Sequence, residues 1–302
     1  MKRLVIAFIG CMFLLNVNGQ QDPMFSHYLV NLLPMNPAYA GSRDILSSTL
    51  FYRNQWSNFG GAPTNINASA HAPFASGNAA WGVNILNDRI GVSNMTMITG
   101  NYAYRIRLPK GKLSFGLSGG LYNYTYNWSK LTLKDENDPV FNNKESALIP
   151  NVGAGVFYQS SKFAIGLSAP QLLTKDIIGS EDFIVTDPRN HYFATASYLF
   201  KINDNLKFKP STMAKFVRNA PLQFDINGMF MIKETINLGL SYRTFNEMAF
   251  LAQFQASRNF WVGYAYDFPF QKVGEISRGS HELYIGYEFS LDKNKVISPR
   301  YF

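Results

Sequence analysis

From about residue 45 onward, apolar side chains alternate with polar or small ones for eight to twelve positions, and each run stops at a turn. Alternation with a period of two is the signature of a β-strand. In the run 260–268, one face carries Phe, Val and Tyr, whereas the other carries Trp261, Gly263, Ala265 and Asp267. An aromatic, apolar face opposite a face of small and charged residues is typical of a strand with lipid outside and a polar interior.

The repeated runs predict an all-β fold: a transmembrane antiparallel β-barrel of about fourteen strands with a non-strand N-terminal extension. An even number of strands lets both ends of the barrel lie on one side of the membrane. Aromatic residues make up 15% of the chain, which suits two aromatic girdles at the membrane interfaces and argues against a soluble all-β domain. The predicted strands lie near 47–56, 65–72, 80–87, 95–107, 112–126, 151–158, 163–169, 191–201, 206–217, 223–232, 235–243, 248–255, 260–268 and 282–289.

The connections between these runs alternate in length, which predicts the orientation of the barrel. Six short turns, at 75–78, 109–111, 159–161, 203–205, 233–234 and 257–259, should face the periplasm. The intervening connections include the long segments 128–150, 170–190 and 269–280, which should face outward.

This register directs a set of charged side chains into the lumen and large apolar side chains toward lipid. A Lys or Arg facing lipid at mid-bilayer would cost about 2–4 kcal/mol, so the inward assignment is also favoured energetically. The candidate lumen-lining residues are Arg105, Arg107, Lys207, Lys209, Lys215, Asp225, Arg243, Asp267 and Glu288. The predicted lumen therefore leans basic, and barrel dimensions alone leave open whether it is empty or plugged.

Four regions follow from these patterns. Residues 1–19 combine a basic start, an apolar stretch and a small-residue exit, as expected of a signal peptide. Residues 20–44, rich in Pro and Asn, should form a periplasmic extension or a plug, and residues 45–290 form the barrel. Residues 291–302 should form a periplasmic tail, either a solvated end or a docking tail, with Pro299, Arg300, Tyr301 and Phe302 as candidate partner-docking residues.

Charge and cysteine content exclude several classes of protein. Loss of Lys2 and Arg3 with the signal peptide lowers the net charge from +8 to +6, and the basic residues are scattered, so nucleic acid binding is not expected. The single cysteine, Cys11, lies in the signal peptide, where lipidation is a minor alternative. Disulfides, zinc thiolates and thiol catalysis are therefore not expected in the processed chain.

No arrangement of residues indicates an active site or a cofactor. The sequence has four histidines and no visible nucleophile, base and orienting group in one place. His281 and Glu282 are adjacent and should point to opposite faces of their strand. The acidic run 135–138 could hold calcium, but it lacks the spacing of a calcium loop, and a solvated turn is the simpler interpretation. We expect a chain that is not an enzyme and binds no cofactor or metal.

Several segments together resemble the PorP/SprF family of type IX secretion outer-membrane proteins over almost the whole processed chain. They are 21–26 (QDPMFS) with Tyr28, 36–42 (NPAYAGS), 52–56 (YRNQW), 61–63 (GAP), 87–91 (NDRIG), 104–106 (YRI), 206–211 (LKFKPS), 220–223 (APLQ), 241–243 (SYR), 263–269 (GYAYDFP), 279–282 (GSHE) and 298–302 (SPRYF).

The resemblance implies a non-enzymatic protein in the outer membrane of a Gram-negative bacterium. Its implied partners are secreted cargo or gliding adhesins with a type B C-terminal sorting domain, and ring or motor components of the secretion system in the periplasm. The implied role is export or surface anchoring of that cargo. The alternative from the residues alone is a passive porin with a basic lumen, and an outer-membrane hydrolase ranks third.

Overall fold

The computed structural model describes residues 24–130, 144–173, 177–178, 184–186, 190–218, 220–244, 247–269, 277–290 and 301–302. Apart from three single-turn 3-10 helices, the regular structure of this part of the chain is β-strand. Across these residues, no helix is long and apolar enough to span a membrane.

The strands follow one another along the chain with mostly short connections. They are β1 Leu46–Asn54, β2 Thr64–Pro73, β3 Ala79–Ile90, β4 Ser93–Leu108, β5 Gly111–Asn127, β6 Lys144–Gln159, β7 Phe163–Ala169, β8 Ile177–Ile178, β9 Ile184–Thr186, β10 His191–Tyr198, β11 Phe200–Lys201, β12 Leu206–Val217, β13 Gln223–Ile232, β14 Ile236–Arg243, β15 Glu247–Gln255, β16 Phe260–Pro269 and β17 Ser280–Phe289. The 3-10 turns are η1 Tyr28–Val30, η2 Pro37–Tyr39 and η3 Trp128–Lys130.

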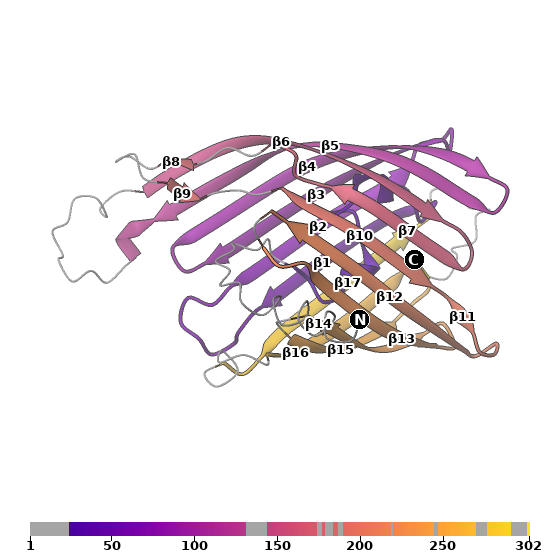
Figure 1. The fold of residues 1–302 in the computed structure, drawn as a ribbon. Coiled ribbons are helices and arrows are strands. Elements are labelled where there is room, and N and C mark those ends of the chain that lie inside the picture. Colours follow the sequence, from indigo (N-terminus) through magenta and orange to yellow (C-terminus); the bar gives the residue numbers. More distant parts are fainter. Residues whose placement is uncertain are drawn as a thin grey trace, which may run out of the picture.

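The main sheet closes on itself. Each strand is antiparallel to its neighbours; β1 pairs with β17, and β10 pairs with both β7 and β12. β10 and β11 both pair with β12 and are separated by Leu199 alone, so they are two parts of one strand, and the described sheet is a 14-strand barrel. Figure 1 shows the strands inclined around a common axis, with β8 and β9 as a separate hairpin. The predicted fold class and strand number are confirmed.

One predicted boundary is wrong. The sequence pattern predicts a loop over 128–150, but β6 begins at Lys144 and pairs with β5 along its whole length. Within this pairing, Pro150 lies opposite Leu121. The proline is tolerated because β6 pairs with β7 only from Ala154 to Gln159, so that the earlier half of the strand has one partner in the sheet. The outward connections are also unequal, since only Gly91 and Val92 separate β3 from β4.

Side chains alternate between the two faces of the barrel wall. Along β14, Leu240 is 58% exposed on the outer face, whereas the inward Asn237 is 2% exposed. Large apolar side chains cover the outside, as a lipid-facing surface requires, and buried polar and small side chains line the inside.

Residues 24–44 lie inside the barrel and are hereafter called the plug. They turn through η1 and η2, and the side chain of Asn36 caps η2 by accepting a hydrogen bond from the backbone N–H of Ala38 (3.0 Å). Most plug residues are buried, and an apolar cluster joins them to the inner wall. Its plug members are Tyr28, Leu29, Leu32, Leu33, Met35, Ala38, Tyr39 and Ala40.

Glycines in the wall let the plug approach closely. A Cβ atom at Gly116 of β5 would overlap the backbone nitrogen of Ala38, and one at Gly155 of β6 would overlap the side-chain oxygen of Asn36. Only residues without a side chain fit at these two positions, so the wall and the plug are matched in shape.

Candidate functional site in the barrel lumen

The plug runs along the length of the lumen. One end of the barrel carries the short turns, including 109–110 and 233–235, and we call it the short-turn end; the other is the long-loop end. The plug begins with Ser26 and His27 against residues at the long-loop end of β16 and β17 and finishes at Asp44, beside the start of β1 and β5.

Arg53 of β1 lies at the centre of a buried group of charges near the long-loop end. Its guanidinium forms ion pairs with Glu247 of β15 (3.1 Å), Glu282 of β17 (3.2 Å) and Asp267 of β16. All four side chains are almost completely removed from solvent. Arg53 and Glu282 are direct partners in the register of β1 and β17, so this contact bridges the strands that close the barrel.

Arg243 of β14 extends this group. It contacts Asp225 of β13 (3.0 Å) and Glu247 (2.6 Å). The charge cluster, defined as Arg53, Asp225, Arg243, Glu247, Asp267 and Glu282, thus holds four carboxylates and two guanidinium groups. Because buried charges are costly unless they are paired and hydrogen-bonded, the excess of carboxylates calls for additional donors.

The plug supplies these donors. The backbone N–H of Ser26 donates to Glu282 (2.7 Å) and its hydroxyl donates to Asp267 (2.7 Å). The backbone N–H of His27 donates to the second oxygen of Glu282 (2.9 Å), and His27 Nδ1 lies 2.9 Å from the same oxygen. Arg53 donates to the Ser26 hydroxyl (2.9 Å). The charge cluster is therefore a built binding site for the first turn of the plug.

Neutral hydrogen bonds fix the middle of the plug. Asn31 donates to the hydroxyl groups of Thr49 (2.8 Å) and Ser69 (2.5 Å). Asn227 of β13 donates to the hydroxyl of Tyr28 (2.8 Å), and burial raises the pKa of that hydroxyl. Tyr28 consequently stays neutral and packs as a large apolar side chain with one satisfied polar atom.

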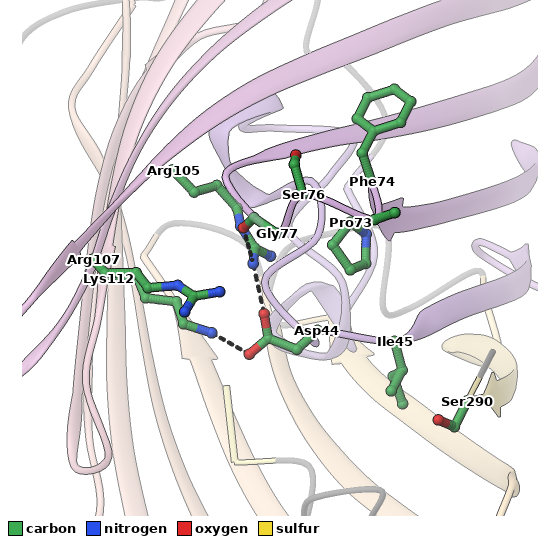
Figure 2. A pocket seen from close by; sticks show the side chains of 11 residues that line it. Asp44, Ile45, Pro73, Phe74, Ser76, Gly77, Arg105, Arg107, Lys112 and Ser290 are labelled. Carbon is green, nitrogen blue, oxygen red and sulfur yellow. Dashed lines mark hydrogen bonds and ion pairs between the residues drawn. The ribbon is translucent and has the colours of Figure 1, made fainter. Parts of the chain in front are cut away.

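At the short-turn end the plug meets basic side chains (Figure 2). Arg105 of β4 donates to Asp44 (2.7 Å) and to the carbonyl of Gly77 (2.9 Å), and Lys112 of β5 pairs with the other Asp44 oxygen. Burial by itself would raise the pKa of the Asp44 carboxyl, but the hydrogen bond from Lys112 and the charges of Lys112 and Arg105 lower it below its ordinary value.

An open cavity of about 720 Å³ surrounds these groups, and we call it the mouth pocket. It is lined by Asp44, Ile45, Pro73, Phe74, Ala75, Ser76, Gly77, Arg105, Arg107, Lys112 and Ser290.

The last two residues of the sequence also contact the barrel. The Tyr301 hydroxyl bonds to Lys207 and Glu234, and the Tyr301 carbonyl accepts from Lys209 (2.7 Å). Phe302 is buried in the apolar cluster that includes the plug. The candidate docking residues Tyr301 and Phe302 therefore lie against the barrel itself, whereas Pro299 and Arg300 fall outside the described residues.

The nine candidate lumen residues occupy separate places. Asp225, Arg243 and Asp267 belong to the charge cluster. Arg105 and Arg107 line the mouth pocket, and Lys207 and Lys209 contact Tyr301. Lys215 lies 3.7 Å from the sulfur of Met24, and Glu288 pairs with Arg43 of the plug (2.8 Å). Of the nine, Arg107 is exposed, Lys207 is half-buried, and the other seven are buried.

The alternation pattern gave no role to Arg53, Glu247, Ser26 or His27, although Ser26, Arg53 and Glu282 lie in segments that carried the family resemblance. His281 and Glu282 do point apart, as expected: Glu282 is fully buried, whereas His281 contacts Tyr264 outside (2.6 Å). Arg243 and Glu247 lie on either side of one hairpin turn and are register partners, so their ion pair could be predicted once β14 and β15 are paired. The contact of Arg53 with Glu282 requires knowledge that the first and last strands meet.

No described residues form a group of His, Cys, Asp or Glu placed to hold a metal ion. The acidic run 135–138 lies outside the described residues, so the solvated turn expected there stays a prediction, with calcium binding as its alternative.

Comparisons with known proteins agree with this architecture. A family model described as "Type IX secretion system membrane protein PorP/SprF" matches residues 17–287. Comparison with curated proteins finds no significant match. Among solved structures, the chain is similar to the CymD monoaromatic hydrocarbon channel, with a TM-score of 0.56 and 10% identity, covering 92% of this chain and 96% of that one. It is also similar to the outer membrane protein Omp33 of Acinetobacter baumannii, with a TM-score of 0.48 and 11% identity, covering 81% of this chain and 98% of that one.

At 10% identity the likeness to CymD shows the fold alone. The family match spans most of the sequence and includes every segment that carried the resemblance except 298–302. With its closed 14-strand barrel, the chain is an outer-membrane protein that belongs to the PorP/SprF family of type IX secretion system membrane proteins.

Proposed function

We propose that this barrel is the component of the type IX secretion and gliding system that is needed for export or surface anchoring of large adhesins, or of other cargo with a type B C-terminal sorting domain. The observation that carries the proposal is the occupied lumen. The plug fills the interior and is held by the charge cluster at one end and by Arg105 and Lys112 at the other. A lumen closed in this way favours binding of proteins over passage of solutes.

The two ends of the barrel suit different partners. The connections 128–143 and 170–190 at the long-loop end are long enough to present a binding surface for cargo outside the cell. The short-turn end, with the mouth pocket and the docked Tyr301, faces the periplasm in this orientation and suits ring or motor components of the secretion system.

Deletion of the gene tests the cargo role. The deletion strain should lose a large adhesin from its surface, as measured by antibody labelling of intact cells and by mass spectrometry of the outer-membrane fraction. Expression of the full-length chain should restore display. Undiminished display of every protein with a sorting domain in the deletion strain would contradict the proposal.

Permeability separates this role from that of a porin. Uptake of small antibiotics and dyes should change little in the deletion strain, because the plug obstructs the lumen in the intact barrel. The purified chain in planar bilayers should give closed or unsteady traces. Stable anion-selective conductance steps from the intact chain would favour the porin instead.

A further inference from the structure

The mouth pocket carries more positive charge than the described part of the chain neutralises. Arg105, Arg107 and Lys112 line it, and Asp44 is the single carboxylate in its lining. Arg105 and Lys112 share the two oxygens of Asp44. The described lining therefore holds two more cations than anions.

Arg107 has no hydrogen bond or ion pair within the described part of the chain. Its side chain is exposed and also lines a neighbouring cavity of about 330 Å³ with Lys112 and Asp44. Gly77 makes room for it: the glycine has a φ of +72°, and a Cβ atom there would lie 2.8 Å from a terminal nitrogen of Arg107. Figure 2 shows Arg107 and Lys112 on one side of the pocket, facing Asp44.

We infer that the mouth pocket binds an acidic, carboxylate-bearing peptide segment of a periplasmic protein. A guanidinium group is a planar fork of donors that matches a carboxylate in two parallel hydrogen bonds. The cavity, at about 720 Å³, lies within the size range of ligand sites in proteins. Lys112 beside Arg107 adds a second positive charge for a neighbouring acidic residue.

The position of the pocket favours a peptide over a lipid headgroup. Arg105 and Arg107 alternate with Ile106 and Leu108, and these two apolar side chains are exposed on the outer, lipid-facing surface. The pocket is completed by Asp44 and Ile45, where the plug joins the first strand. A ligand would thus enter from the aqueous mouth at the short-turn end, which faces the periplasm in outer-membrane barrels.

Peptide binding to the full-length chain tests this inference without reference to cargo display. The chain is folded into nanodiscs of phosphatidylcholine, and a fluorescein-labelled hexaglutamate peptide is titrated by fluorescence anisotropy. Arg107→Gln should weaken binding about tenfold, since it removes the unpaired bidentate donor. Binding by the unaltered chain should also weaken as salt is raised.

Arg258→Gln is the matched control, because Arg258 is an exposed arginine in the β15–β16 turn at the same end of the barrel and lies outside the pocket. The Arg258→Gln variant should bind the hexaglutamate peptide with the same affinity as the unaltered chain. Equal losses in both variants, or no binding by the unaltered chain, would overturn the inference. Folding of each variant is checked by heat-dependent mobility on gels.

A lipid headgroup is distinguished by native mass spectrometry of the chain in detergent with added phosphatidylglycerol. Lipid adducts should be equally abundant for the unaltered chain and Arg107→Gln. If the lipid adducts disappear in Arg107→Gln and the unaltered chain binds no peptide, the ligand of the mouth pocket is a lipid phosphate and not a peptide.

Discussion

Arg53 is the residue on which the buried charges of the lumen converge. Its guanidinium contacts three carboxylates from three strands and also the Ser26 hydroxyl of the plug. In a site without solvent, removal of one partner leaves the others uncompensated, and the cost exceeds the net value of the pair. Arg53 therefore connects the stability of the wall to retention of the plug.

Arg53→Met should lower the free energy of unfolding by about 3–5 kcal/mol, because it leaves Glu247, Asp267 and Glu282 without their shared cation. The measurement is urea unfolding of the protein in lipid vesicles, followed by tryptophan fluorescence. Arg258→Met, on an exposed turn, should change stability by less than about 0.5 kcal/mol. Similar stabilities for the two variants would show that the charge cluster is not structural.

Asp44 gives a pH-dependent prediction. Its pKa is lower in the folded chain than its ordinary value of 3.8, so its contribution to stability is present above that value and is lost as pH falls through the folded-state pKa. Asp44→Asn should therefore lower the free energy of unfolding by about 1 kcal/mol at pH 7 and by little at pH 2. Asparagine also tolerates the positive φ of 58° at this position.

Unfolding titrations of the unaltered chain and Asp44→Asn at both pH values measure this difference. If the two proteins differ by the same free energy of unfolding at pH 7 and pH 2, the carboxylate charge of Asp44 does not stabilise this end of the barrel.

At the level of elements, the plug packs closely against the wall at two glycines, Gly116 and Gly155. Gly116 faces the lumen and meets the backbone of the plug, whereas a Cβ atom at Gly119, on the same strand, would meet no atom of another segment within 4 Å. Gly116 and Gly119 together separate an effect on the plug from a general effect of alanine in β5.

Gly116→Ala should displace the plug near Ala38, because the new methyl group would overlap its backbone. We expect a loss of about 1–3 kcal/mol in stability and faster cleavage of the plug by protease added to the folded protein. Gly119→Ala should behave as the unaltered chain does. Equal protease resistance in the two variants would contradict a tight contact between η2 and β5.

Strand positions were predictable because each strand has one lipid-facing side, which imposes a period of two on the sequence. The wrong boundary lies where a proline interrupts the pattern, because Pro150 hid the first half of β6. The predicted strand 191–201 is present, although Leu199 divides it into β10 and β11 close to Pro210 of β12, which has no N–H to donate. The path of the plug has no periodicity; it depends on contacts such as Gly116 with Ala38, which only the folded barrel creates.

The charged site was predictable in part for the same reason. Alternation predicts which charged side chains face inward, including Asp225, Arg243 and Asp267. It does not tell which strand lies across the seam or where Ser26 lies in the lumen. The arrangement around Arg53 depends on barrel closure, which joins residues more than two hundred positions apart.

For the whole molecule, the position of the plug in the lumen predicts that the plug controls conductance. Removal of residues 24–41 should convert closed traces into stable conductance steps in planar bilayers, because no described side chain of the wall replaces the plug's apolar cluster. Heat-dependent mobility on gels checks that the shortened barrel is folded. A folded, shortened barrel that remains closed would show that other parts of the chain seal the lumen.

The position of Ser26 across the closing strands has a consequence for assembly. The pairing of β1 with β17 joins the most distant segments in the described sheet, so its closure carries the largest loss of chain entropy. Ser26 bonds to Arg53 on one side of that joint and to Glu282 on the other. We therefore expect the plug to favour closure of the barrel during assembly, because its contacts with Arg53 and Glu282 form together only when β1 and β17 pair. A chain that closed without the plug would leave these buried charges with fewer hydrogen-bond partners.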